Sequence, residues 1–241
     1  MKPVVAIYST FLQRAYDAII HDVCLQGLPV VFAIDRAGIV GEDGATHQGV
    51  FDLSYLRSIP GLTVMAPSDK SELCRMLEFA VALQKPVAIR YPRGICFERH
   101  DNVDTAVELG ISEIIMRGAD ITLVAIGIMV SQAVAAADEL KKQGISATVI
   151  NARFVKPLDP AIAELIRDTG KAVIIEENVK QGGFGSAVLE LCQEKGVHAD
   201  IRRVGIKDDF IEHAAQDETR AEVGLTTHEI VRSVKAILSG R

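Results

Sequence analysis

The first part of the chain alternates short apolar runs with segments in which apolar residues recur at helical spacing. The apolar runs have the length and β-branched composition of strands that are buried on both faces of a sheet. We expect these strands at 3–7, 29–34, 62–65 and 87–91. The intervening helices are expected at 10–26, 51–59 and 70–83. Such alternation predicts a parallel sheet covered on both faces.

A second unit with the same alternation follows residue 118. Its strands are expected at 121–126, 147–150, 172–175 and 201–204. Its helices are expected at 130–143, 160–168, 185–194 and 227–238. Charged and turn-forming residues interrupt the apolar pieces between the two units, so 95–118 is predicted to be an inter-domain connection. The predicted fold class is α/β, with two doubly wound, mainly parallel-sheet domains at 1–94 and 119–241.

Composition indicates a globular protein and limits the classes of partner that it is expected to bind. Of 241 residues, 49% are hydrophobic and 24% are charged, and the formal net charge is −6. A net acidic chain suits neither nucleic acid nor an anionic membrane, so neither is an expected partner. The 4 cysteines are widely spaced and form no metal-ligand pattern. The apolar runs are shorter than a membrane span and no signal-peptide pattern is present, so we expect a cytoplasmic protein.

Polar side chains follow three of the predicted strands. Tyr8 comes after the first strand, Arg36 after the second, and Arg93 after the run at 87–91. Beyond Arg36, a Gly-rich loop carries Asp43 and His47. Because the carboxyl ends of parallel strands meet at one edge of a sheet, we expect these side chains to converge on one site.

The residue types indicate what such a site could bind. An arginine fork matches the oxygens of phosphate or carboxylate, and Arg36 and Arg93 would supply two forks. His47 could exchange a proton near neutral pH, while Asp43 could orient it or bind a substrate hydroxyl. Two simpler interpretations stay open. The loop could be a surface turn, and each arginine could form a salt bridge with a neighbouring acid.

Other motifs carry weaker signals. Gly-Gly-Phe-Gly at 182–185 opens a predicted helix and could cradle phosphate. It lacks a complete nucleotide-binding fingerprint, so a packing or capping role is favoured. Glu176 and Glu177 end a predicted strand, where a solvated loop edge or an interface is a commoner role than acid–base catalysis.

Together, the motifs resemble those of the transketolase-like thiamine diphosphate enzymes. The resemblance rests on Asp-Arg-Ala-Gly-Ile-Val-Gly-Glu-Asp-Gly-Ala-Thr-His-Gln-Gly at 35–49, Arg-Tyr-Pro-Arg-Gly at 90–94 and Phe-Val-Lys-Pro-Leu-Asp at 154–159. The opening Asp-Arg-Ala-Gly and the Arg-Tyr-Pro-Arg-Gly are similar to the branch that makes 1-deoxy-D-xylulose 5-phosphate. The similarity covers nearly the whole chain. It implies an N-terminally incomplete pyrimidine-binding domain at 1–94 and a transketolase-like C-terminal domain at 119–241.

The resemblance also implies a reaction. The complete enzyme would be a transferase of isoprenoid and thiamine biosynthesis that condenses pyruvate with glyceraldehyde 3-phosphate and releases carbon dioxide. By the same resemblance, Tyr8, Arg36 and Arg93 would hold the acceptor's phosphate. Asp43 and His47 would bind its hydroxyl and aldehyde oxygens, with His47 assisting proton transfer.

Thiamine diphosphate with Mg²⁺ is the cofactor that the resemblance implies. Phe11 would stack on the aminopyrimidine ring, and Arg14 would lie beside the same pocket. The family's Gly-Asp-Gly segment, which holds metal and diphosphate, and its activating Glu have no counterpart in this sequence. We therefore expect the C-terminal portion of the enzyme or one subunit of a split form, inactive alone. The missing N-terminal domain or subunit would be its partner, and the assembly would be a homodimer.

Two other interpretations stay open. The chain could be the β-type subunit of a split transketolase or of a 2-oxo acid dehydrogenase. A phosphosugar acceptor calls for both Arg36 and Arg93, whereas a lipoyl acceptor does not. The chain could also be a non-catalytic remnant that acts as a binding or regulatory module.

Overall fold

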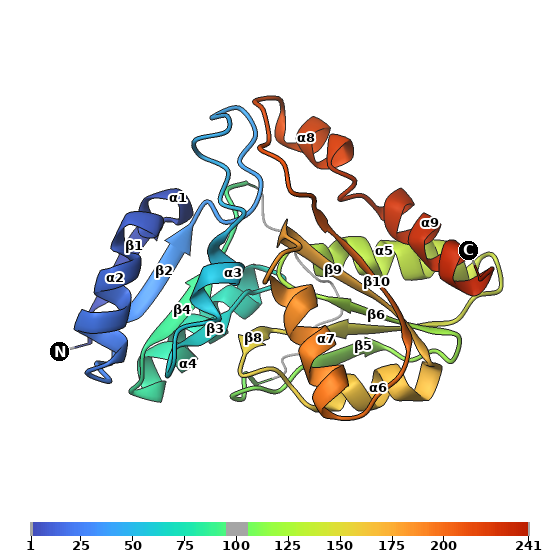
Figure 1. Ribbon diagram of the computed structural model, residues 1–241, viewed down its shortest axis with the longest axis horizontal. Coiled ribbons are helices and arrows are strands. Elements are labelled where there is room, and N and C mark those ends of the chain that lie inside the picture. The colour runs from blue at the N-terminus through green and yellow to red at the C-terminus, as the bar shows by residue number, and fades with distance from the viewer. Residues whose placement is uncertain (1, 95–105, 241) are drawn as a thin grey trace.

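The computed structural model describes residues 2–94 and 106–240 of the chain. These residues form two α/β units, each built on one sheet, that lie side by side (Figure 1). In the described residues, the first sheet has five strands in the order β1-β2-β4-β3-β8. Its strands are β1 (Val4–Tyr8), β2 (Val31–Asp35), β3 (Thr63–Met65), β4 (Val87–Arg90) and β8 (Phe154–Lys156). All neighbours pair in parallel except β3 and β8, which are antiparallel.

The second sheet has the order β10-β9-β6-β7-β5 over the described residues. Its strands are β5 (Glu113–Met116), β6 (Ile121–Ala125), β7 (Ala147–Asn151), β9 (Lys171–Val179) and β10 (Asp200–Ile206). Here too the pairing is parallel except at one edge, where β5 runs antiparallel to β7. Two mainly parallel sheets confirm the predicted α/β fold class.

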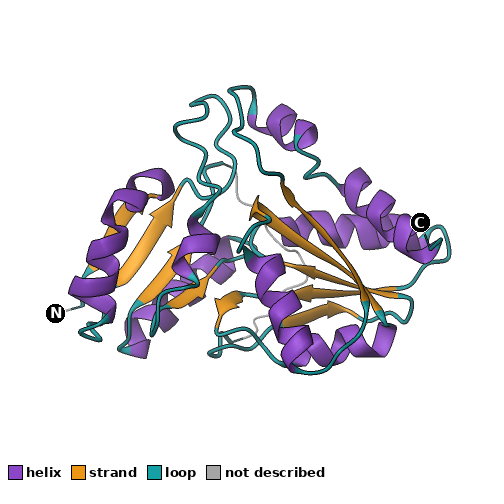
Figure 2. Cartoon of the chain, viewed as in Figure 1, coloured by secondary structure: helices purple, strands orange, loops and turns teal. Residues whose placement is uncertain are grey.

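Helices lie on both faces of the sheets (Figure 2). The chain between β1 and β2 is helical in successive pieces: α1 (Ser9–Leu12), a 3₁₀ turn (Gln13–Ala15), α2 (Tyr16–Ala18) and a π-helical turn (Ile19–Cys24). The other helices of the first half are α3 (Asp52–Leu56) and α4 (Lys70–Leu83). The second half adds α5 (Met129–Lys141), α6 (Ala161–Thr169), α7 (Phe184–Glu194), α8 (Gln216–Glu222) and α9 (Thr227–Leu238).

One apolar core is shared by both halves of the chain. It joins Leu12 and Leu53 of the first half to Ile162 of α6 and Phe184 of α7, and all four are almost fully buried. A second core lies under α5 and α9, and a third lies under α4. Burial of apolar surface is the main stabilising term of such layers, so the shared core fixes the two sheets against each other.

Three elements differ from the sequence prediction. β5 falls inside the predicted connection at 95–118, of which 95–105 lies outside the described residues. β8 belongs to the second half of the sequence but completes the first sheet. α8 was not predicted, because its sequence Gln-Asp-Glu-Thr-Arg-Ala-Glu has no apolar periodicity. The domain boundaries at 94 and 118 stay a prediction.

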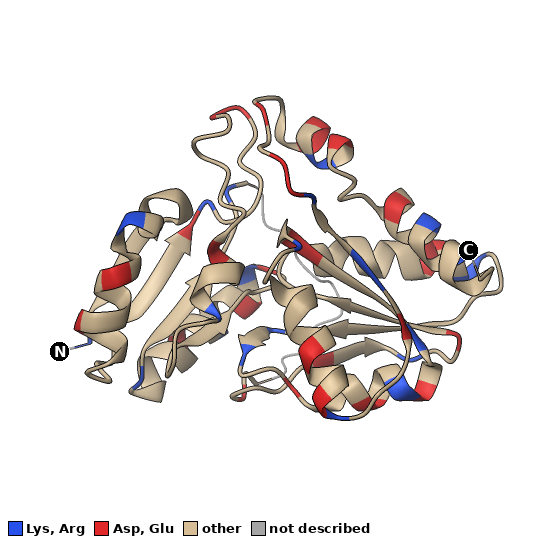
Figure 3. Cartoon of the chain, in the orientation of Figure 1, with Lys and Arg blue, Asp and Glu red and all other residues tan. Residues whose placement is uncertain are grey.

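Acidic and basic residues are interspersed over both halves of the molecule (Figure 3). None of the described helices is both long enough and apolar enough to cross a bilayer.

Candidate active site

The carboxyl ends of β1, β2 and β4 bring the predicted site residues together. Tyr8 pairs with Asp35 in the register of β1 and β2, and Ile34 pairs with Arg90 in that of β2 and β4. Arg36 then adopts φ +55°, a left-handed conformation that is uncommon for arginine and turns the chain into the Gly-rich loop. The carboxylate of Asp35 accepts a 2.6 Å hydrogen bond from the Arg36 N–H.

Arg36 and Arg93 both bind the same carboxylate oxygen. Nη1 of Arg36 lies 2.6 Å from Oδ2 of Asp43, and Nη1 of Arg93 lies 2.9 Å from it. The side chains are 24% exposed for Arg36, 46% for Arg93 and 31% for Asp43, so solvent reaches all three. The salt-bridge interpretation of these arginines is therefore correct for this structure. Each guanidinium has further N–H donors, for which an incoming anion would compete with Asp43.

An aromatic surface borders the two arginines. The guanidinium carbon of Arg36 lies 4.1 Å from the centroid of the Tyr8 ring, in cation–π geometry. Tyr8 stacks on Phe11 with a centroid distance of 5.4 Å, and Phe11 meets His47 edge-on at 6.0 Å. Phe11 remains 44% exposed. An exposed ring face of this kind suits a flat heteroaromatic ligand, which is the fit that an aminopyrimidine requires.

His47 and Arg14 have different surroundings. Nδ1 of His47 lies 2.9 Å from the Thr46 hydroxyl, so one of its two ring nitrogens is engaged in a hydrogen bond. Arg14 is exposed in the 3₁₀ turn, and its side chain makes no hydrogen bond or ion pair within 2–94 and 106–240. The structure thus gathers Tyr8, Phe11, Arg36, Asp43, His47 and Arg93, which we call the arginine cluster, and leaves Arg14 outside its contacts.

Two glutamines, which were not predicted, fix the Gly-rich loop. Oε1 of Gln48 accepts hydrogen bonds from the N–H groups of Val40 and Gly41 at 2.8 and 3.3 Å. Nε2 of Gln216, at the start of α8, donates to the carbonyls of Ile39 at 2.6 Å and Arg93 at 3.0 Å. An uncharged amide far away in the sequence gives no signal in a search for titratable groups, so only the fold reveals Gln216.

A buried ion pair lies close in sequence to residues of the arginine cluster. Asp52 in α3 and Arg90 in β4 are 0% and 3% exposed, and their charged groups lie 3.2 Å apart. Ser9 donates to the same carboxylate at 3.0 Å. Arg90 also donates to the carbonyl of Glu177 at 3.1 Å, so this arginine links the first sheet to β9. A charge can be buried in this way only because it has both an ionic partner and hydrogen bonds.

Glu177 is buried beneath the Gly-rich loop, not solvated as expected. Its Oε1 accepts a 2.7 Å hydrogen bond from Nε of Arg220 in α8, and Oε2 has no hydrogen-bond partner in the described residues. Burial raises the pKa of Glu177, and the charge of Arg220 opposes that rise. A Cβ on Gly38 would lie 2.0 Å from Oε2, so the loop approaches this carboxylate as closely as only glycine allows.

Glu176 is also buried, and it caps α7. Its two carboxylate oxygens accept hydrogen bonds from the N–H groups of Phe184 at 2.6 Å and Gly185 at 2.9 Å. Burial raises the pKa of Glu176 to about 7, against the lowering effect of these hydrogen bonds and of Arg203. Two N–H groups of the Gly-Gly-Phe-Gly motif, those of Phe184 and Gly185, are thus satisfied by Glu176, which favours the capping role over a phosphate cradle.

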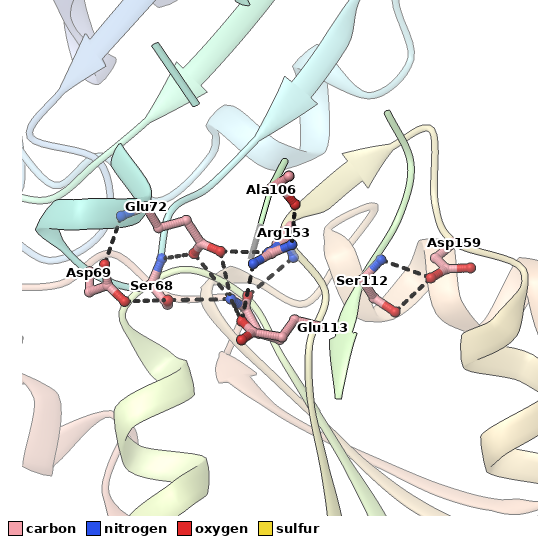
Figure 4. A network of polar contacts seen from close by, with 9 residues as sticks. Ser68, Asp69, Glu72, Ala106, Ser112, Glu113, Arg153 and Asp159 are labelled. Carbon is pink, nitrogen blue, oxygen red and sulfur yellow. Dashed lines mark hydrogen bonds and ion pairs between the residues drawn. The ribbon is translucent and has the colours of Figure 1, made fainter. Parts of the chain in front are cut away.

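A further buried network joins the two halves of the chain away from the cluster (Figure 4). Nε of Arg153 lies 2.6 Å from Oε1 of Glu72, and Nη2 of Arg153 lies 3.3 Å from Oε2 of Glu113. Asn151 donates to both oxygens of Glu72 at 3.0 Å. Asp69 caps α4 by accepting from the Glu72 N–H at 2.7 Å. This network lies between α4, β5 and β7, so its role is structural.

Comparison with known proteins defines the class. Residues 1–97 match the pyrimidine binding domain of transketolase, and residues 110–230 match the transketolase C-terminal domain. A solved structure described as a split gene transketolase, inactive beta4 tetramer, superposes with a TM-score of 0.90 at 31% identity, over 98% of this chain and 76% of that one. The chain therefore belongs to the transketolase family.

Within the transketolase family, the chain is similar to curated relatives of one kind. The chain is 52% identical to a 1-deoxy-D-xylulose-5-phosphate synthase of Heliobacterium modesticaldum and 55% identical to one of Desulforudis audaxviator, in each case over 98% of its own length. It is thus a homologue of the C-terminal region of these synthases. It spans only 37% and 38% of the length of these two relatives.

Proposed function

We propose that this chain is the C-terminal part of a 1-deoxy-D-xylulose-5-phosphate synthase, which condenses pyruvate with D-glyceraldehyde 3-phosphate and releases carbon dioxide. The convergence of Arg36 and Arg93 on one solvent-accessible carboxylate oxygen carries the proposal, because a phosphorylated acceptor needs paired guanidinium groups. The identity of 52–55% to synthases over almost the whole chain supports it.

In this proposal, the arginine cluster binds the acceptor. Arg36 and Arg93 bind the phosphate oxygens, and the Tyr8 ring holds the Arg36 guanidinium in place through its 4.1 Å contact. Asp43 exchanges its ion pairs for a hydrogen bond from an acceptor hydroxyl. His47 holds the proton that the aldehyde oxygen takes up as the new carbon–carbon bond forms.

The cofactor of the complete enzyme is proposed to be thiamine diphosphate with Mg²⁺. Phe11 would stack on the aminopyrimidine ring, which its 44% exposure and flat contact with Tyr8 permit. Bound cofactor supplies the electron sink that the loss of carbon dioxide from pyruvate requires. Arg14 is proposed to lie beside this pocket. The metal and diphosphate are proposed to be held by the N-terminal part of the enzyme, as the family resemblance implies.

Acceptor preference tests this proposal directly. The chain would be combined with the N-terminal region of the Desulforudis audaxviator synthase, which is 55% identical over the shared part. The combination would be offered pyruvate with glyceraldehyde 3-phosphate, unphosphorylated glyceraldehyde or a lipoyl peptide. We expect turnover with the phosphorylated aldehyde and at least tenfold lower kcat/KM with glyceraldehyde. Preference for the lipoyl peptide would contradict the proposal.

A second candidate is a subunit of a split transketolase-type enzyme. The solved split gene transketolase covers 98% of this chain, so an independent chain of this architecture exists in the family. This candidate shares the arginine cluster but differs in its partner, which would be a separate polypeptide. A non-catalytic binding module is the third candidate, and absence of turnover with every acceptor would favour it.

A further inference from the structure

Gln216 connects the two segments that carry the arginines. Its Nε2 donates one hydrogen to the Ile39 carbonyl at 2.6 Å and one to the Arg93 carbonyl at 3.0 Å. Ile39 lies in the Gly-rich loop after Arg36, whereas Arg93 follows β4. Both donors of one amide group are therefore used to join the two segments, and no side chain of the arginine cluster takes part in this link.

The backbone around Gln216 leaves little room for adjustment. A Cβ on Gly41 would lie 2.8 Å from the Gln216 backbone nitrogen, and a Cβ on Gly94 would lie 3.2 Å from the Gln216 Oε1 atom. Both glycines have positive φ angles, of +86° and +133°. The loop and the Arg93 segment thus close around α8 at positions where only glycine fits.

Helix α8 is anchored to strand β9 of the second sheet. Arg220, one turn after Gln216, donates to the buried Oε1 of Glu177 at 2.7 Å, and Thr219 is fully buried. Glu177 belongs to β9, so Gln216 is tied through α8 to the rigid sheet of the second half. A cavity of about 150 Å³ lies beside it, lined by residues that include Arg93, Gln216 and Arg220.

We propose that Gln216 is a positioning residue that sets the spacing of Arg36 and Arg93 and so determines the affinity for the phosphate end of the acceptor. The identity of that acceptor rests on the proposed function; the spacing of the arginines does not. Anion affinity depends on the placement of both guanidinium groups, because a fork displaced by about 1 Å loses its paired hydrogen bonds. Gln216 itself touches neither the anion nor the cofactor in this account.

The direct test measures inorganic phosphate binding to this chain by isothermal titration. Gln216→Met keeps the length of the side chain and removes both donors, and Gln216→Glu keeps the size and removes the N–H groups. We expect each to weaken phosphate binding about tenfold, which corresponds to about 1.4 kcal/mol. Gln193→Met is the matched control, because Gln193 is exposed on α7 and its side chain has no hydrogen bond among the described residues.

A double-mutant cycle separates positioning from general destabilisation. If Gln216 acts through Arg93, adding Gln216→Met to Arg93→Ala should weaken phosphate binding far less than it does alone. In the reconstituted enzyme, Gln216→Met should raise the KM for glyceraldehyde 3-phosphate and leave the KM for pyruvate within twofold. Full additivity, or an equal rise in both KM values with a lower melting temperature, would overturn the inference.

The outcomes also separate this inference from the proposed function. Phosphate binding that is identical in the unaltered chain and in both Gln216 variants overturns the inference alone. Failure of the unaltered chain to bind phosphate overturns the anion site and the inference with it. Weaker binding in the variants, together with no synthase turnover, would uphold the positioning role and contradict the proposed function.

Discussion

Asp43 and Arg93, which are 50 positions apart in the sequence, form an ion pair with Oδ2 2.9 Å from Nη1. The same oxygen also binds Arg36 at 2.6 Å. Asp43 therefore occupies the position between two cations where a ligand's phosphate oxygen would be most strongly attracted. An incoming anion competes with this carboxylate for the guanidinium N–H groups. The affinity for phosphate therefore depends on how much more strongly the two arginines attract the phosphate than they attract Asp43.

Replacing Asp43 with Asn should have opposite effects on binding and turnover. Loss of the carboxylate frees both guanidinium groups, so inorganic phosphate should bind this chain several-fold more tightly in titration calorimetry. In the reconstituted enzyme, kcat should fall at least tenfold, because the hydrogen bond to the acceptor hydroxyl weakens. Glu42→Gln is the control, since Glu42 is an exposed carboxylate in the same loop. Weaker phosphate binding by Asp43→Asn would refute the competition.

Replacing Arg93 with Ala should act on one substrate more than on the other. The KM for glyceraldehyde 3-phosphate should rise about 10–100-fold in the reconstituted enzyme, since a charge-assisted hydrogen bond contributes about 1.5–3 kcal/mol. The KM for pyruvate should change little. Arg117→Ala, an exposed arginine at the end of β5, serves as the control. Equal changes in both KM values would remove Arg93 from the phosphate site.

Asp52 should be far more important for stability than an exposed acid. Asp52→Ala leaves the guanidinium of Arg90, 3% exposed, without its ionic partner. We expect a loss of about 3–5 kcal/mol in the free energy of unfolding, measured by chemical denaturation. Glu190→Ala breaks the Arg57–Glu190 pair, in which Glu190 is 58% exposed, and should cost about 1 kcal/mol or less. Similar losses for both variants would show that Arg90 is accessible to water.

Glu176 should make stability fall as pH rises. Its pKa is about 7 in the folded chain against 4.5 for a free carboxyl, so the native state binds a proton that the unfolded state has released between these values. The slope of unfolding free energy with pH is then negative, and the contribution is largest below pH 4.5 and lost by about pH 7. Denaturant titrations from pH 5 to 8 should give a flatter profile for Glu176→Gln. Parallel profiles for the two proteins would exclude the shift.

The sequence predicted most sheet strands, because buried strands such as β4 and β6 are largely apolar runs. Strand β1 was expected to be buried on both faces, but it lies at the sheet edge, where Val4 and Val5 are 49% and 38% exposed. Tyr8, Arg36 and Arg93 could be placed near one another on the same principle, since they follow strands that end at the same edge. Strand β8 was missed because it has only three residues and lies against β3, far away in the sequence. Its pairing depends on how the second half of the chain packs on the first, which no local pattern encodes.

The buried charges could not be located from the sequence either. Glu177 follows the predicted strand at 172–175 and precedes a polar turn, a pattern that favours solvent, yet it lies within β9 and is covered by Arg220 and the Gly-rich loop. Arg90 stands at the end of an apolar run like Arg93, but it turns inward to Asp52 whereas Arg93 remains 46% exposed. Arg90 is the last residue of β4, whereas Arg93 lies beyond the strand, and the local sequence does not show which of the two arginines turns into the core.

We propose that this chain supplies the acceptor site of a synthase and needs an N-terminal part for catalysis. The decisive measurement is formation of 1-deoxy-D-xylulose 5-phosphate from pyruvate and glyceraldehyde 3-phosphate, with thiamine diphosphate and Mg²⁺ present. The chain would be assayed alone and after mixing with the N-terminal region of a relative. We predict product in the mixture and none from either part alone. Product from this chain alone would contradict the account.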